Sequence, residues 1–117
     1  MPDQADRTTL KRVDSDPIVI VGATPDAPPA YVEALIAAGY EVMMVERVMA
    51  AAVEIAAVMP RVVVLSTSVP MPDHRLIHEA SIAVTAEVVI LAPDTDGVEV
   101  AERIDRASAR ATQRRGE

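Results

Sequence analysis

The feature that most constrains the fold is the segment from Pro60 to Pro70, where an unbroken apolar run, residues 62–65, lies between two prolines. Most of this run is β-branched and no polar residue interrupts it, which predicts a strand buried on both faces. Strands of this kind form parallel sheets covered by helices, and such sheets place their ligands and chemistry at the carboxyl ends of the strands. Ser66 directly follows the run, so its identity is central to any functional interpretation.

Three further apolar segments alternate with stretches of helical periodicity. Strict alternation of strand and helix with short connections predicts a parallel sheet with helices on both faces, which is a three-layer α/β fold. The segment 41–46 has a glutamate at each end, which suits a strand at the edge of the sheet. The predicted strands are residues 18–21, 41–46, 62–65 and 88–91, and the predicted helices are about 30–38, 48–59, 73–86 and 98–113.

The apolar positions within each helical segment predict which side of the helix is buried. Asp73 is the expected N-cap of the third helix, and Gly39 is placed to end the first. The expected buried residues are Val32, Leu35 and Ile36 in the first helix, Met49, Ala52, Val53, Ala56 and Met59 in the second, Leu76, Ile77, Ala80, Ala83 and Val84 in the third, and Val100, Ala101, Ile104, Ala107 and Ala111 in the last.

Length and composition exclude several classes of function. A chain of 117 residues that is 50% hydrophobic is expected to form one domain with one core. It has no Phe or Trp, two Tyr and a net charge of -7, so base stacking is scarce, phosphate backbones are repelled, and no nucleic-acid partner is expected. No cysteine is present for a disulfide or a thiolate site. No apolar run approaches the roughly 20 residues that span a bilayer, so we expect a cytoplasmic protein without a membrane partner.

The chain divides into three parts by composition. Residues 1–16 are polar and mixed in charge, which predicts a flexible N-terminal leader. Residues 17–113 carry all the predicted strands and helices and therefore form the α/β domain. Residues 114–117 are expected to be a frayed tail.

The segment from Pro60 to Pro70 resembles the receiver domain of two-component response regulators. Receivers commonly carry a proline, an acidic residue, four apolar residues, the phosphoacceptor aspartate, three variable residues and a second proline. Here Arg61 stands at the acidic position and Ser66 at the phosphoacceptor position. The resemblance covers roughly residues 17–113. It implies a flavodoxin-like parallel sheet with strand order 2-1-3-4, in which the fifth strand of the family is missing or replaced.

The residues that carry the chemistry of the family are replaced. The two acidic residues that hold Mg²⁺ in receivers correspond to Gly22 and Ala23, and the Thr or Ser that ends the fourth strand corresponds to Ala92. Formation of an acyl phosphate needs a carboxylate nucleophile and a cation held by oxygen ligands, and Ser66 with these neighbours supplies neither. The resemblance therefore implies a pseudo-receiver: a non-catalytic protein-interaction module in bacterial signal transduction, with no metal and no cofactor.

Two features of the last strand and helix predict where partners bind. Arg103, Arg106 and Arg110 recur at three- and four-residue spacing, which is typical of a solvated helix face but also suits docking of an acidic partner. With Val100 and Ile104, they form the predicted interaction face. Without a fifth strand, residues 88–91 would lie at an open edge, which the last helix, residues 8–13 or a second subunit could cover. We therefore expect self-association as a homodimer through this strand and helix.

Other residues allow alternative interpretations. The loops 22–26 and 66–68 could bind a small molecule, which is the second functional hypothesis. His74 and His78 share a helix face at a spacing that can hold zinc, although no third ligand is evident. Asp94 and Asp96 could bind a cation but are more typical of a turn. Ser66 lacks the flanking glycines of a hydrolase nucleophile and is more typical of a hydroxyl that bonds to local backbone.

Overall fold

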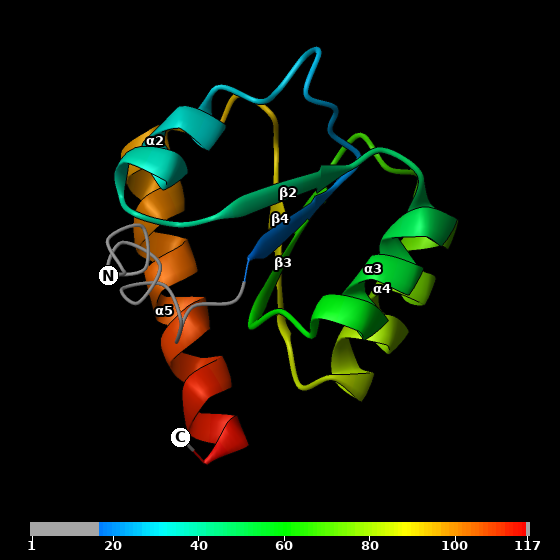
Figure 1. The fold of residues 1–117 in the computed structure, drawn as a ribbon. Helices are drawn as coiled ribbons and strands as arrows, with labels where there is room; N and C mark the ends of the chain where they lie inside the picture. The colour runs from blue at the N-terminus through cyan, green and yellow to red at the C-terminus, as the bar shows by residue number, and fades with distance from the viewer. Residues whose placement is uncertain (1–16, 117) are drawn as a thin grey trace, which may run out of the picture.

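The computed structural model describes residues 17–116, which form one four-stranded parallel sheet (Figure 1). The strand order is β2-β1-β3-β4, as the sequence predicted, and β2 lies at an edge as its terminal glutamates indicated. The fold is a three-layer α/β fold of flavodoxin-like type. The strands are β1 (Ile18–Val21), β2 (Val42–Val45), β3 (Val62–Ser66) and β4 (Glu87–Leu91). The predicted leader, residues 1–16, lies outside the described residues.

Two helices cover each face of the sheet (Figure 1). The helix after β1 and the last helix pack together on one face, and the two helices between them pack together on the other. This arrangement, with order 2-1-3-4, is what right-handed crossovers between parallel strands produce. The helices are α2 (Tyr31–Ala37), α3 (Val48–Val58), α4 (Met71–Ala83) and α5 (Gly97–Arg115).

Burial on both faces explains why the central strands are apolar throughout. Ile18 and Ile20 of β1 belong to the core beside α2 and α5, whereas Val19 and Val21 belong to the core beside α3 and α4. Alternate residues of a strand point to opposite faces, so a sheet covered twice needs apolar residues at every position. Every residue of β1 and β3 is buried, including Ser66 at the end of β3.

The predicted buried side of α3 is wrong. Met49 and Val53 are 73% and 68% exposed, and the residues that pack into the core are Ala51 and Ile55. The helix contains a single charged residue, Glu54, so the sequence offers little contrast between an inner and an outer side. The other residues that are exposed instead of buried are Ile36 of α2, Ala56 of α3, Met59 after α3 and Ala83 of α4.

Three helix boundaries also differ from the prediction by two residues or more, and one of them is the end of α4, which lies at Ala83 and not near residue 86. Helix α4 begins at Met71 with Pro70 as its N-cap, so Asp73 lies inside the first turn and is not the cap. Pro72 fits there because the first turn of a helix needs no backbone N–H partner. Among the described residues of the predicted frayed tail, 114–116, helix α5 continues to Arg115 and Gly116 caps it.

Arg115 explains why α5 extends further than expected. Its Nη2 donates to the carbonyl oxygens of Met59 at 3.1 Å, Pro60 at 2.7 Å and Val84 at 2.9 Å. These carbonyls belong to the loops that precede β3 and β4, so one guanidinium joins the end of α5 to both connections. The predicted apolar face of α5 is confirmed at four positions that are 0% exposed: Val100, Ile104, Ala107 and Ala111.

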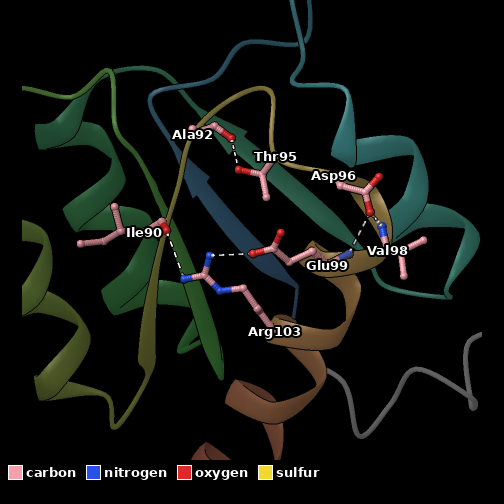
Figure 2. A network of polar contacts seen from close by, with 7 residues as sticks. All are labelled: Ile90, Ala92, Thr95, Asp96, Val98, Glu99 and Arg103. Carbon is pink, nitrogen blue, oxygen red and sulfur yellow. Dashed lines mark hydrogen bonds and ion pairs between the residues drawn. The ribbon is translucent and has the colours of Figure 1, made fainter.

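The N-cap of α5 gives a direct test of how the helix begins. Asp96 Oδ2 accepts from the backbone N–H of Val98 at 3.0 Å and of Glu99 at 3.3 Å (Figure 2). We expect Asp96→Ala to lower the free energy of unfolding by about 1 kcal/mol, because both N–H groups lose their acceptor. Urea titration followed by circular dichroism measures this. The exposed Asp94 is the matched control, and an equal loss in Asp94→Ala would contradict the capping role.

The two tyrosines predict how stability depends on alkaline pH. Burial raises the pKa of Tyr31 from 10.0 to about 12. Burial also raises the pKa of Tyr40, and the hydrogen bond that its hydroxyl donates to Asp105 raises it further. Below pH 10 both states keep these protons. Above it, the unfolded chain ionises first, so the free energy of unfolding falls as pH rises.

We expect Tyr31→Phe to reduce that fall between about pH 10 and 12. At neutral pH, the same change is expected to be neutral or stabilising, because the Tyr31 hydroxyl is buried without a hydrogen-bond partner among the described residues. Urea unfolding at pH 9 and pH 11 measures both effects. A destabilised Tyr31→Phe at neutral pH, or an unchanged alkaline fall, would contradict this account of the residue.

Candidate functional site

The carboxyl edge of the sheet brings together the positions that the sequence singled out. Gly22 directly follows β1, Ser66 ends β3 and Ala92 directly follows β4. Gly22, Ala23 and Ser66 line one crevice of about 350 Å³, and Pro93 and Asp94 also line it. The crevice lies between β1 and β3, where the strand order reverses, which is the usual ligand position in open α/β sheets.

Ser66 uses its hydroxyl within its own loop. The residue is 2% exposed, and its Oγ lies 2.8 Å from Ser68 Oγ and accepts from the Ser68 backbone N–H at 3.2 Å. This agrees with the interpretation of a small hydroxyl that bonds locally. Ala92 acts through its backbone, since its carbonyl accepts from the Thr95 N–H at 3.1 Å and from Thr95 Oγ1 at 2.7 Å (Figure 2).

Gly22 allows two loops to come into contact. Its φ is +91°, and a Cβ atom added there would lie 2.6 Å from Val69 Cγ2 and 3.3 Å from Ser66 Cβ. The position therefore excludes a side chain for two independent reasons, conformation and space. The loop after β1 thus packs directly against the loop after β3, and neither loop directs a carboxylate into the crevice at Gly22, Ala23 or Ser66.

The histidine pair is only partly available as a ligand set. His74 is 8% exposed, and its Nε2 lies 2.9 Å from the carbonyl oxygen of Val69. This contact holds the start of α4 against the loop that follows β3. Within residues 17–116 no group of three or more His, Cys, Asp or Glu side chains is arranged to hold a metal ion.

A second crevice shares Gly22 and Ser68 with the first, and most of its lining residues were not singled out from the sequence. It has a volume of about 600 Å³ and is lined by loop residues together with the starts of α3 and α4. Its charged members are Glu46, Arg47 and Asp73, and Met49 forms part of its apolar wall. The lining comes from three separate parts of the sequence, Gly22, residues 46–49 and residues 68–76, so the crevice depends on how the starts of α3 and α4 pack.

Strand β4 forms one side of the sheet, with β2 at the far side, and part of its backbone faces away from the other strands. The N–H of Glu87 donates to Arg61 at 2.8 Å, and the carbonyl of Leu91 accepts from Thr67 at 3.0 Å, so both face β3. Because the N–H and C=O groups of a strand alternate in direction, those of Val88 and Ile90 face away from β3, toward the open edge. In the sheet of residues 17–116, no strand pairs with this side of β4.

Three arginines of α5 lie along that open edge. Arg103, Arg106 and Arg110 line a groove of about 410 Å³ together with Val88, Val89 and Ile90, and we call these six residues the arginine groove. Arg103 Nη2 lies 3.4 Å from the carbonyl oxygen of Ile90, and its Nη1 lies 3.9 Å from Glu99 (Figure 2). The predicted cluster of arginines therefore reaches the exposed backbone of β4.

The arginines of the groove differ in whether a carboxylate lies close to them. Arg110 Nε lies 3.1 Å from a carboxylate oxygen of Glu87, and Arg114 pairs with the other oxygen of the same residue. Arg106 is exposed and has no ion-pair or hydrogen-bond partner among the described residues. Arg106 is thus the cation of the groove that is most available to a partner.

The predicted interaction face is wrong at two positions, Val100 and Ile104. Val100 and Ile104 are 0% exposed and pack in the core between α5 and the sheet, so they cannot contact a partner. An amphipathic helix turns its apolar positions toward the core, and the arginines of α5 are left at its border with the solvent. Of the predicted interaction face, only Arg103, Arg106 and Arg110 remain at the surface.

No family model, curated protein or solved structure matches this chain. Within residues 17–116, no helix combines the length and apolar character needed to cross a membrane. A functional proposal therefore rests on the geometry of the carboxyl edge of the sheet and of the open edge of β4.

Proposed function

We propose that this chain is a non-catalytic, receiver-like interaction module in signal transduction, and that its protein partner binds at the arginine groove. The observation that carries the proposal is the unpaired edge of β4, which is bordered by three arginines, one of them without a partner among the described residues. Cationic side chains beside open backbone groups favour an anionic protein surface.

The carboxyl edge supports the non-catalytic part of the proposal. Phosphoryl transfer through an acyl phosphate needs a carboxylate acceptor and oxygen ligands for a divalent cation. Gly22 and Ala23 offer no side-chain oxygen, and the Ser66 hydroxyl is buried and bonded to Ser68. A fold that retains this sheet without those groups is suited to recognition.

Photo-crosslinking in a lysate of the source organism tests the interaction. A photoreactive residue placed at Ala109, which is exposed on α5, would be carried by the wild-type chain, Arg106→Glu and Arg75→Glu. Arg75 is 86% exposed on α4 and pairs only with Glu79 among the described residues, so its reversal makes the same change of charge away from the groove. We expect a partner to be captured by wild type and Arg75→Glu and to be reduced in Arg106→Glu. Equal capture by all three would refute the groove as the interface.

Small-molecule binding is a second candidate, because two crevices meet at Gly22 at the point where the strand order reverses. A ligand there would raise the melting temperature and shift the backbone amide signals of Gly22 and Ser68. A thermal-shift screen followed by NMR would identify such a ligand. A ligand whose shifts map to α5 instead would exclude this function for the two crevices.

A further inference from the structure

We propose that the partner segment adds to the sheet as an extra β-strand beside β4 and places acidic side chains against Arg103, Arg106 and Arg110. The inference rests on the proposed function, since it describes how the partner would occupy the arginine groove. It commits to one kind of partner, an extended acidic protein segment. The backbone of β4, the spacing of the arginines and the local positive charge of α5 each support it.

The backbone of β4 supplies the first argument. Val88 and Ile90 together present two N–H and two C=O groups to the open edge, which is the pattern that a strand-adding segment recognises. One of these groups, the Ile90 carbonyl, is held by Arg103 at 3.4 Å. That distance is long for a hydrogen bond, so a strand N–H could replace the guanidinium at little cost while Arg103 turns to an acidic side chain.

The spacing of the arginines supplies the second argument. Arg103 and Arg110 are seven residues apart on a helix, which places them about 10 Å apart along its axis. Side chains on one face of a strand recur every 6 to 7 Å or so. Two or three alternate side chains of an added strand therefore span the same length as the three arginines. A segment with carboxylates at alternate positions on the α5 side would match them.

Charge supplies the third argument, and it separates an acidic segment from a second copy of the chain. Residues 103–115 carry five arginines, whereas the whole chain has 11 basic residues and a net charge of -7. Two copies related by a two-fold axis through β4 would place one arginine groove against the other. Like charges directly opposite each other are destabilising, so this edge favours an acidic partner over itself.

A designed peptide tests the inference on the full chain. The probe is Thr-Glu-Val-Glu-Val-Glu-Thr with blocked ends, and the first control replaces each glutamate with lysine. The second control is a pair of peptides that are N-methylated at alternate residues. In each peptide the methyl groups remove the backbone N–H donors along one edge of the strand, so one of the two peptides cannot donate hydrogen bonds to β4. Binding is followed by fluorescence anisotropy, and by NMR for the Val88 and Ile90 amide signals.

We expect the acidic peptide to bind and to slow hydrogen exchange at the Val88 and Ile90 amides. One of the two N-methylated peptides should bind at least about tenfold more weakly, because its hydrogen bonds to β4 are lost. Arg106→Glu should weaken binding about fivefold, and Arg75→Glu, the matched reversal on α4, should leave it unchanged. Thermal melting of each variant checks that the fold is retained.

Each negative result would refute a different part of the inference. If both N-methylated peptides bind as well as the parent, the added strand is refuted, but an acidic partner at the groove survives. If the lysine peptide binds as well as the glutamate peptide, the acidic partner is refuted. If the acidic peptide does not bind, the inference is overturned. It is also overturned if sedimentation shows a dimer that is lost in Arg106→Glu, because a second copy would then occupy the edge. The crosslinking comparison tests the proposed function independently of these results.

Discussion

Ile104→Asp is expected to unfold the protein. Ile104 is 0% exposed in the core that α5 shares with β1, β3 and β4, and a carboxylate there would be buried without a partner. The lost apolar contacts together with the buried charge are expected to cost more than about 4 kcal/mol, which approaches the total stability of a typical domain. Circular dichroism and urea titration would show a chain with little cooperative unfolding.

Ala109→Asp is the matched control, because it introduces the same carboxylate on the exposed side of the same helix. A surface substitution of this kind is expected to change the free energy of unfolding by about 0.5 kcal/mol or less. If Ile104→Asp melted cooperatively near the wild-type temperature, α5 could not be packed on the sheet as described. The comparison also distinguishes loss of folding from loss of binding, because Arg106→Glu is expected to keep the fold.

Gly22→Ala is expected to lower the free energy of unfolding by about 2 to 3 kcal/mol. A residue with a Cβ pays about 1 to 2 kcal/mol to adopt a left-handed conformation, and Gly22 has a φ of +91°. The added Cβ would also meet Val69 Cγ2 at 2.6 Å, so the loop after β3 must move. Urea titration measures the total loss.

Two variants separate these two causes. Gly116 has a φ of +77° but no atom within 4 Å of an added Cβ, so Gly116→Ala isolates the conformational cost. The double variant Gly22→Ala with Val69→Ala removes the contact, and it is expected to lose less stability than the sum of the two single variants. If Gly22→Ala were no worse than Gly116→Ala and the double variant were additive, close packing of the two loops would be refuted.

The sheet was predictable from sequence because its signal is local. The unbroken runs around Val19 and Val63 can be buried only between two layers of helix, and alternation with helical segments then fixes a parallel sheet. The strand order followed from the resemblance to receiver domains, and the paired strands confirm it. The positions at the carboxyl edge followed in turn, since Gly22, Ser66 and Ala92 each stand at a strand end.

The errors arose where a local pattern carries too little contrast or a contact is long-range. Helix α3 is apolar on nearly every side, so Met49 could not be assigned to its outer side from periodicity. The end of α5 depends on Arg115, whose hydrogen-bond acceptors at Met59, Pro60 and Val84 are remote in sequence. The hydrogen bond between Tyr40 and Asp105 is also a long-range contact, because the two residues are 65 positions apart in the sequence.

The candidate site was predicted only in part for a related reason. The spacing of Arg103, Arg106 and Arg110 marked one face of a helix, but only the packing of α5 against β4 shows that this face borders exposed backbone. The same packing removes Val100 and Ile104 from the surface. Self-association through this edge, which the sequence led us to expect, is untested, and sedimentation at high micromolar concentration distinguishes it from the acidic segment proposed above.

The central proposal is that this sheet recognises a protein partner and does not accept a phosphoryl group. Intact-mass spectrometry of the full chain after incubation with acetyl phosphate and Mg²⁺ tests it most directly, with Ser66→Ala as the matched variant. The account predicts an unchanged mass for both chains, because Gly22, Ala23 and Ser66 offer neither a carboxylate acceptor nor cation ligands. A stable gain of one phosphoryl group in the wild-type chain that is absent from Ser66→Ala would contradict it.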